Sequence, residues 1–250
     1  MISDRINSII NAIDVIIKAR PRSQLFRYYL KRILGEHNQF TEDIFVHTEG
    51  LLFNCGRYIE NCKVAVSSFE PEVQKIISSN NWNTFIDVGS HIGKYSITLG
   101  KKGSKVYAVE ADKRNYDLLL KNLKLNNIRN AEAFNILCGE KKGAKIFYSS
   151  NNHPATNSIN PLIDSSKTEK QMDCLDNLIK EIKTPCLMKI DVEGSELLVL
   201  NGSRKLLEAF RPTIIFEAWD NTAFVKISSF LKSFGYSFKR LDEYNYMAYT

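Results

Sequence analysis

The stretch TFIDVGSHIGKYS, residues 84–96, constrains the fold more than any other part of the chain. A short apolar run ends in Asp87, passes through Gly89 and Gly93 and continues into a helical pattern. This order predicts a buried strand, a tight turn and a helix N-terminus, the place where doubly wound α/β proteins bind nucleotide-like ligands. The dinucleotide fingerprint G-x-G-x-x-G requires glycine where His91 stands, so the pattern favours a cationic ligand without phosphates.

Two later segments repeat this arrangement of an apolar run that ends in an acid. The run KVYAVE ends in Glu110, where α/β nucleotide-binding proteins use an acid to accept hydrogen bonds from ribose hydroxyls. The run LMKIDVEGSE, residues 187–196, ends in acids that are followed by glycine and a helix start. Together the three segments predict a parallel sheet with acidic residues at its carboxyl edge.

Four segments of the chain resemble the FkbM family of S-adenosylmethionine-dependent methyltransferases. They are FIDVGSHIGKYS, VYAVEAD, MDCLDNL and, above all, LMKIDVEGSE, and the resemblance covers roughly residues 69–219. It implies an α/β class I, Rossmann-like fold with a seven-stranded, mostly parallel sheet and helices on both faces. It also implies S-adenosyl-L-methionine as the cofactor. We expect residues 69–250 to form the methyltransferase domain, and residues 1–68 to form an N-terminal helix and small strand region for substrate or oligomer contacts.

Hydrophobic periodicity predicts the elements of this domain. The predicted strands are 84–88, 105–110, 131–137, 187–191, 213–217, 237–241 and 244–249. The predicted helices are 93–101, 113–126, 195–210 and 223–234. Two or three short strands are expected within residues 40–66, and residues 143–169, rich in Ser, Asn and Pro, are expected to form a substrate-covering loop.

The cofactor residues follow from the strand ends and from the resemblance. Asp87 is expected to accept from the cofactor amine, the glycines to admit the main chain, and Glu110 to bind the ribose. Capping of the following turns is the structural alternative for both acids. His91, where the family usually carries Asn, is interpreted mainly as filling the turn, with a role as base or carboxylate contact as alternatives. The predicted cofactor-binding residues are Asp87, Gly89, Ser90, His91, Gly93, Glu110, Ala111, Asn135, Ile136 and Leu137.

Three residues are predicted to serve the chemistry. Lys189 and Asp191 are two apart on a strand, so they share a face, and Glu217 ends a neighbouring strand on the same rim. Methyl transfer to an alcohol needs a general base, for which Asp191 is the candidate. A purely structural charge network is the alternative for the three. No metal is predicted, because a divalent cation needs more oxygen ligands than the pattern offers. Glu70 and Glu72, beside Pro71, are within possible reach of the site, whereas His153 is interpreted as a surface residue.

Composition narrows the class of protein further. The formal charge of +6 is too weak to demand nucleic acid. Five cysteines without C-x-x-C spacing argue against a disulfide framework or a zinc site, and Cys55 and Cys62 are expected to be reduced. The chain has neither a bilayer-spanning apolar run nor a secretory h-region, so a cytoplasmic location is expected.

An isoleucine stripe dominates the first nineteen residues. The favoured interpretation is a helix that packs on its own domain, with a homodimer contact or peripheral membrane docking as alternatives. The stripe contains Ile2, Ile6, Ile9, Ile10, Ile13, Ile16 and Ile17, opposite Asp4, Arg5, Asn7, Asn11, Asp14 and Lys18. The basic residues that follow are Arg20, Arg22, Arg27, Lys31 and Arg32.

The resulting functional hypothesis is a methyltransferase that O-methylates a hydroxyl of a small-molecule or glycan acceptor, such as a sugar, glycolipid or natural product. An RNA methyltransferase is the first alternative, although no basic platform with interleaved aromatics supports nucleic acid. A nicotinamide-dependent oxidoreductase is disfavoured by His91 in the turn. A non-catalytic module that kept the cofactor fold is the third alternative.

Overall fold

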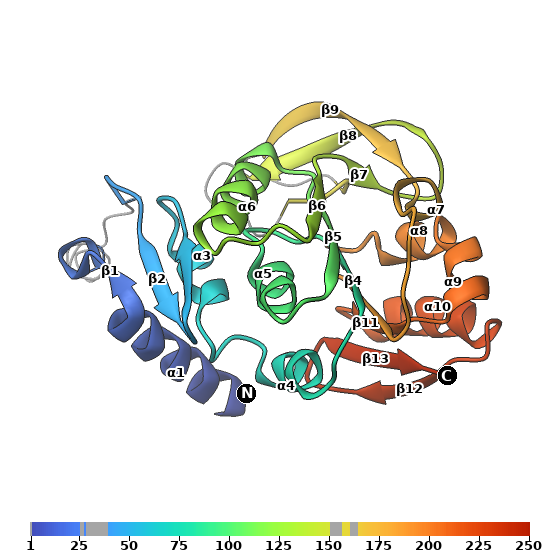
Figure 1. Cartoon of the computed structure of the whole chain (residues 1–250), viewed down its shortest axis with the longest axis horizontal. Coiled ribbons are helices and arrows are strands. Elements are labelled where there is room, and N and C mark those ends of the chain that lie inside the picture. Colours follow the sequence, from blue (N-terminus) through green and yellow to red (C-terminus); the bar gives the residue numbers. More distant parts are fainter. Residues whose placement is uncertain (1, 26–27, 29–39, 151–156, 161–164) are drawn as a thin grey trace.

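The computed structural model describes residues 2–25, 28, 40–150, 157–160 and 165–250, with side chains from residue 10 onward in the first helix (Figure 1). The basic residues Arg27, Lys31 and Arg32 and the loop residue His153 therefore lie outside the described residues.

A seven-stranded sheet forms the centre of the molecule, in the order β12-β13-β11-β10-β4-β5-β6. All neighbours from β11 to β6 are parallel, and β13 is antiparallel to both β11 and β12. The strands are β4 (Thr84–Val88), β5 (Lys105–Val109), β6 (Ala131–Phe134), β10 (Cys186–Ile190), β11 (Thr213–Glu217), β12 (Ser237–Arg240) and β13 (Asn245–Tyr249). This sheet confirms the predicted α/β class and the class I methyltransferase topology.

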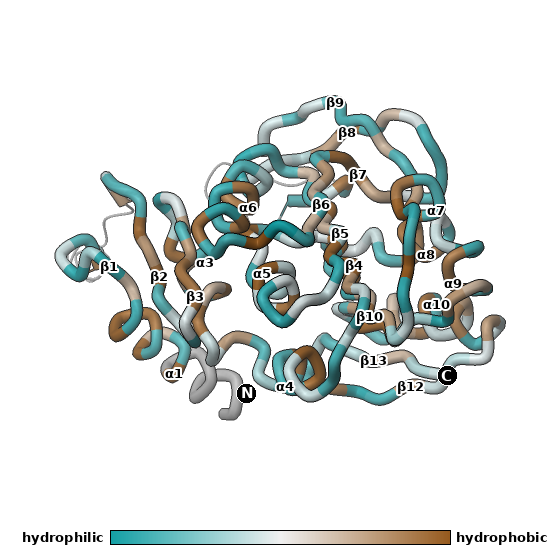
Figure 2. Tube along the Cα trace, viewed as in Figure 1, coloured by the Kyte–Doolittle hydropathy of each residue, from teal (hydrophilic) through white to brown (hydrophobic). Residues whose placement is uncertain are grey.

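Helices cover both faces of this sheet. Phe85, Leu187 and Ile215 pack into one hydrophobic cluster with α4 (Pro71–Ser79), α5 (Lys94–Lys101) and α6 (Lys113–Leu125). The alternate residues Ile86 and Met188 pack into a second cluster on the other face. Its helices are α7 (Leu175–Leu178), α8 (Glu196–Asn201), α9 (Arg204–Phe210) and α10 (Asn221–Lys232). Because both faces are covered, β4 and β10 are buried along their whole length and are mostly apolar, with Thr84, Asp87 and Lys189 as the exceptions (Figure 2).

Residues 40–66 differ from the expectation in their last third. They form β2 (Phe45–Thr48), which pairs with both β1 (Ala19–Arg20) and β3 (Leu51–Asn54), so two of the expected two or three strands are present. The segment then forms the helix α3 (Ile59–Ala65). Buried residues of this segment join the hydrophobic cluster that contains α5 and α6. The domain boundary between residues 68 and 69 stays a prediction.

The predicted loop at residues 143–169 is largely a hairpin. It contains β8 (Gly143–Ser150) and the start of β9 (Ser165–Asp173), which form a small sheet with β7 (Leu137–Cys138). A loop was expected here because of the Ser, Asn and Pro content, whereas β8 pairs antiparallel with β9; half of the β8 residues are exposed. Predicted strand 131–137 also ends early, at Phe134, and predicted helix 195–210 divides into α8 and α9.

The first helix, α1 (Ile2–Lys18), packs on the domain with the side opposite to the one expected. Val15 is fully buried, and Lys18 is only partly exposed. The side chains that remain exposed are Ile10, Ile13, Ile16 and Ile17. Packing of this isoleucine stripe on its own domain was therefore a wrong expectation for the described part of the helix. No helix among the described residues is long and apolar enough to cross a membrane, and all five cysteines are free thiols.

Candidate active site

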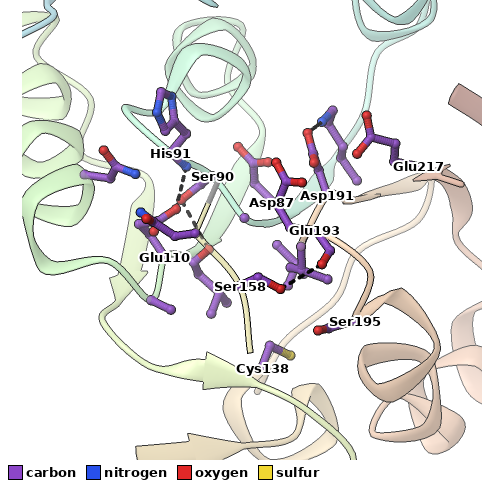
Figure 3. Close-up of a pocket in the computed structure, with 18 of the residues that line it drawn as sticks. Asp87, Ser90, His91, Glu110, Cys138, Ser158, Asp191, Glu193, Ser195 and Glu217 are labelled. Atoms are coloured by element: carbon purple, nitrogen blue, oxygen red, sulfur yellow. Dashed lines mark hydrogen bonds and ion pairs between the residues drawn. The ribbon is translucent and has the colours of Figure 1, made fainter. Parts of the chain in front are cut away.

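A cavity opens at the carboxyl edge of the central sheet, where β4, β5, β10 and β11 end. Figure 3 shows Asp191 and Glu217 on one side of it and Glu110 and His91 across from them. Ser158, between β8 and β9, also lines the cavity and donates to the backbone oxygen of Glu193 over 3.0 Å. The cavity lies where the carboxyl ends of parallel strands converge, which is the usual ligand position in such sheets.

The turn after β4 is shaped by two glycines with positive φ. A Cβ on Gly89 would lie 1.8 Å from the backbone oxygen of Asp191, so glycine lets this turn lie directly against the end of β10. Gly93 does not line the cavity, and a Cβ there would lie 2.4 Å from Leu119 Cδ1. Gly93 thus serves the packing of α5 on α6, while Gly89 and Ser90 line the cavity.

Glu110 directly follows β5 and is buried at the cavity wall. Its Oε2 accepts from the His91 amide at 2.8 Å, and its Oε1 accepts from the Asp112 amide at 2.7 Å. Burial raises the pKa of Glu110 to about 7, against the lowering effect of these two amides. Each carboxylate oxygen keeps a second lone pair for a ligand hydroxyl. Capping of the turn and ligand binding are therefore compatible at this residue.

Asp87 lies near the carboxyl end of β4, beside Lys189 in the register of the sheet. Its Oδ2 accepts from the Ser96 hydroxyl at 2.6 Å, and the side chain lines the cavity. Burial raises the pKa of Asp87 to about 6, although the Ser96 hydrogen bond and the Lys189 charge lower it. A ligand ammonium at this position would favour the ionised form.

Of the residues predicted near the end of the third strand, some line the cavity and one has a structural role. Ala111, Ile136 and Leu137 line the cavity and give it an apolar wall. Asn135 does not line the cavity. Its side-chain amide donates to the backbone oxygens of Glu110 and Ala111 at 2.8 and 3.1 Å. Asn135 therefore ties the segment after β6 to the segment after β5.

The His91 imidazole lies at the cavity with both ring nitrogens buried and without a hydrogen-bond partner among the described residues. Its backbone is left-handed, with φ 52°, and its amide is the donor to Glu110. Burial lowers the pKa of His91 to about 4, so the ring is neutral at physiological pH. A neutral ring in the turn agrees with the interpretation that His91 mainly fills it.

Lys189 and Asp191 form a buried ion pair, with 2.6 Å between Nζ and Oδ2. Lys189 Nζ also lies 4.0 Å from Glu70 Oε2, which accepts from the Tyr95 hydroxyl at 2.6 Å. Burial opposes the charge of Lys189, but the carboxylates of Asp191 and Glu70 raise its pKa above the ordinary value. The lysine is therefore fully charged and fixes Asp191 at the cavity.

Glu217 ends β11, the strand next to β10, and lines the same cavity as Lys189 and Asp191. Its Oε2 is buried without a hydrogen-bond partner among the described residues. Burial and the Asp191 carboxylate raise the pKa of Glu217 to about 9, so it is protonated at neutral pH. Beside it Trp219 lines the cavity with 54% of its surface exposed. In the part of the chain that the structure describes, no cluster of three or more His, Cys, Asp or Glu could hold a metal ion.

Several residues that line the cavity were missing from the predicted site residues, whereas Glu70 was expected to be within reach of it. Tyr95, Glu70 and Glu193 line it, and Lys94 Nζ donates to the backbone oxygens of Val66 and Phe69, which holds the segment before α4 against α5. Glu72 has no such position, because it is exposed and pairs with Lys75. Glu70 and Glu193 have positive φ, as His91 does, and such backbone strain concentrates at functional sites.

The sheet order and the acid-lined turns define a class I methyltransferase. The family model described as Methyltransferase FkbM domain matches residues 87–238, more than half of the chain. The chain belongs to the FkbM methyltransferase family, and its cofactor is S-adenosylmethionine. No curated protein matches the chain significantly.

One of the solved structures that match, the first below, supports the fold. The crystal structure of a methyltransferase FkbM from Methylobacillus flagellatus KT matches with a TM-score of 0.51 and 19% identity, over 68% of this chain and 44% of that chain. The chain thus spans less than half the length of that protein. M. jannaschii TYW2 in complex with AdoMet matches with a TM-score of 0.46 and 15% identity, over 86% and 85% of the two chains. A Pyrococcus abyssi tRNA (uracil-54, C5)-methyltransferase in complex with S-adenosyl-L-homocysteine matches with 0.47 and 12%, over 86% and 45%. The last two scores are too low to bear on substrate.

The cavity fits the chemistry of this cofactor. S-adenosylmethionine carries an ammonium, a carboxylate, two ribose hydroxyls and an adenine ring. The cavity offers the carboxylate of Asp87, the second lone pairs of Glu110, and an apolar wall at Ala111, Ile136 and Leu137. These groups follow one another along the ends of β4, β5 and β6, in the order that an extended cofactor requires.

Proposed function

We propose that this methyltransferase transfers a methyl group to a hydroxyl oxygen of a sugar, glycolipid or related natural product. The observation that carries this proposal is the carboxyl pair beside the cofactor turn: Asp191 is fixed by Lys189, whereas Glu217 is neutral and unpartnered among the described residues. A base and a hydrogen-bond donor next to each other suit an alcohol, which must lose a proton and be oriented.

We assign the cofactor contacts from the geometry of the turn. Asp87 would hold the ammonium, the Gly89–Ser90 turn the carboxylate, Glu110 the ribose hydroxyls, and Ala111, Ile136 and Leu137 the adenine. His91 supports this arrangement through its amide contact to Glu110. Asn135 and Gly93 support it indirectly, since they position the chain behind the cavity wall.

S-adenosylmethionine supplies an electrophilic methyl group on its sulfonium. Asp191 would accept the proton from the acceptor hydroxyl as the new carbon–oxygen bond forms and the bond between the methyl carbon and the sulfonium sulfur breaks, with S-adenosylhomocysteine as the leaving group. Lys189 positions Asp191 through their ion pair and places a positive charge against its carboxyl group. Glu217, neutral at physiological pH, would donate a hydrogen bond to an oxygen of the acceptor. Alignment of the acceptor by these groups contributes much of the acceleration.

Trp219 supports a sugar as the acceptor. Its indole is half-exposed at the cavity, next to Glu217, and its ring lies 5.1 Å from that of Tyr244. A large aromatic face beside a hydrogen-bond donor matches a sugar ring, which has an apolar face and a rim of hydroxyls.

Tritium transfer from S-[methyl-³H]adenosylmethionine tests this proposal. The acceptors are free hexoses and deoxyhexoses, a lipid-linked sugar extract, and bulk tRNA as the nucleic-acid probe. An O-methyl ether keeps its label in base, whereas a methyl ester releases labelled methanol, so base treatment separates the two products. We expect base-stable label on a sugar fraction and none with Asp191→Asn.

Two results would contradict the proposal. Label found in tRNA alone would assign the enzyme to nucleic acid. Calorimetric binding of S-adenosylmethionine without label on any fraction, or base-labile label only, would remove hydroxyl methylation. Calorimetric titration with NAD provides the control for the cofactor class, and no binding is expected.

A further inference from the structure

Four isoleucines of α1 form an exposed apolar strip on the outside of the molecule. Ile10, Ile13, Ile16 and Ile17 are 44–56% exposed and lie on one side of the helix. We call these four residues the isoleucine face. In Figure 1, α1 lies at the edge of the molecule, away from the central sheet. A soluble helix normally turns such a strip toward its own domain, so this exposure requires an explanation.

The opposite side of α1 is fastened to the domain by polar contacts. Asn11 Nδ2 donates to the backbone oxygen of Lys63 at 3.2 Å, and Lys18 Nζ donates to Ser67 Oγ at 2.5 Å. Asp14 Oδ2 accepts from the Ser68 amide at 3.3 Å. Rotating the isoleucine face inward would break all three contacts and expose Val15. The isoleucine face is therefore directed outward by the docking of the helix itself.

Positive charge lies at the C-terminal end of the isoleucine face. Arg20 Nη1 donates to the backbone oxygens of Ile17 and Ala19 at 2.8 and 2.7 Å. Arg22 Nη2 reaches the same Ile17 oxygen at 3.4 Å. Both arginines are exposed. Between residues 10 and 22 the sequence has one acid, Asp14, which is on the docked side and pairs with Lys18 at 2.8 Å. The exposed strip is thus apolar along its length and cationic at its end.

We propose that the isoleucine face, with Arg20 and Arg22, docks on the surface of an anionic lipid membrane. An amphipathic helix with apolar residues on one side and flanking basic residues lies in the plane of the interface and is drawn to anionic headgroups. The four half-exposed isoleucines offer on the order of a few hundred Å², below the ~800 Å² per partner of a stable protein interface. Charge and area both favour the membrane over a second copy of this chain.

Sedimentation of the 250-residue chain with lipid vesicles tests this inference. One vesicle set is pure phosphatidylcholine, and the other contains roughly 30% phosphatidylserine. We expect several-fold more binding to the anionic vesicles at 0.1 M salt, and a loss of that difference at about 0.5 M salt, where surface charges are screened.

Three double variants resolve the contributions. Ile13→Glu with Ile17→Glu should lower the vesicle partition coefficient at least tenfold on anionic vesicles. Arg20→Gln with Arg22→Gln should lower it roughly tenfold on anionic vesicles and leave neutral vesicles unchanged. The matched control is Leu120→Glu with Leu125→Glu, which alters two exposed leucines of α6 and should bind as the wild type does. Circular dichroism and the calorimetric affinity for S-adenosylmethionine verify folding of each variant.

Three outcomes would overturn the inference. The first is wild-type protein that shows no preference for anionic vesicles at low salt. The second is a control variant that loses binding as strongly as the isoleucine variant. The third is a dimer in sedimentation velocity that the isoleucine variant converts to monomer while vesicles bind neither form, because the isoleucine face would then serve a second copy of the chain.

Discussion

Lys189 donates a 2.6 Å hydrogen bond to Asp191, two residues further along the chain. The bond joins a residue within β10 to the residue that follows the end of this strand. The lysine is buried between strands, whereas Asp191 reaches the cavity. A lysine in the middle of an otherwise apolar strand is thereby explained, since its charge is balanced where it is needed. Lys189 thus stabilises the fold, and Asp191 presents its carboxyl group to the cavity.

Removal of this lysine should destabilise the protein strongly. Lys189→Met leaves the carboxylates of Asp191 and Glu70 without their cation, at a cost of roughly 3 kcal/mol in the free energy of unfolding. Denaturant unfolding of Lys189→Met, Asp191→Asn and the double variant measures the coupling. The double variant should be more stable than the sum of the single effects by about 0.5–3 kcal/mol. Additive effects would show that the ion pair contributes nothing to stability.

Asp191→Asn should separate catalysis from cofactor binding. The amide cannot accept the hydroxyl proton as a carboxylate does, so turnover should fall by roughly 10²–10⁴-fold. The calorimetric affinity for S-adenosylmethionine should stay near the wild-type value. Asp117→Asn, at an exposed position of α6 paired with Lys113, is the matched control and should turn over normally. Normal turnover by Asp191→Asn would exclude it as the base.

Glu110→Ala should weaken cofactor binding. Loss of the ribose hydrogen bonds should raise the dissociation constant by about 5- to 150-fold, which corresponds to ~1–3 kcal/mol. Because Glu110 also accepts from two amides of the turns, thermal unfolding should be recorded alongside calorimetry. Glu132→Ala, on the neighbouring strand β6 and paired with Lys105, is the control. A folded Glu110→Ala with unchanged affinity would remove Glu110 from the cofactor site.

Glu217 should make stability depend on pH. Its pKa rises from 4.5 to about 9 on folding, so the folded state holds a proton that the unfolded state has lost. Its contribution to stability is present below about pH 4.5 and is lost as the pH rises toward 9, by at most about 1.4 kcal/mol per pH unit. Glu217→Gln removes this loss, and its stability advantage over the wild type should grow between pH 5.5 and 8.5 in urea unfolding. Parallel pH profiles would contradict a buried, protonated Glu217.

Trp219→Ala should affect acceptor binding and little else. With a sugar acceptor, loss of the aromatic face should raise KM by roughly tenfold, from ~1–1.5 kcal/mol of stacking. The kcat and the affinity for S-adenosylmethionine should change little. Tyr249→Ala, at an exposed aromatic position outside the cavity lining, should leave KM unchanged. An unaltered KM in Trp219→Ala would separate this residue from acceptor recognition.

The sequence predicted the buried strands well and the exposed elements poorly. β4 and β11 have the predicted boundaries, because layers on both faces impose continuous apolar runs that end in acids. The β8–β9 hairpin was missed, since half of the β8 residues are exposed and backbone pairing, which depends little on the side chains, holds β8 to β9. In α3 the buried residues Ile59, Cys62 and Ala65 recur at helical spacing, but the helix has only seven residues and directly follows two strands.

The residues of the candidate site were likewise predictable only in part. Residues at strand ends, such as Asp87, Glu110 and Asp191, were predictable because topology brings strand ends together. Glu70 was expected within reach of the site from the family resemblance, and it lines the cavity. Tyr95 reaches the cavity through tertiary packing, which no spacing rule encodes. Asn135 was assigned to the cofactor from its position, whereas its amide is engaged by backbone oxygens.

The docking of α1 through its polar side has a consequence for local unfolding of the protein. Hydrogen bonds of Asn11, Asp14 and Lys18 hold the helix to the domain. From Ile10 to Lys18 only Val15 is fully buried, and Ala19 just beyond the helix is buried as well. Detachment of α1 would uncover little apolar area, and water would replace most of the broken hydrogen bonds. The helix is therefore able to open as a unit with a free energy far below that of global unfolding, while the seven-stranded sheet stays closed.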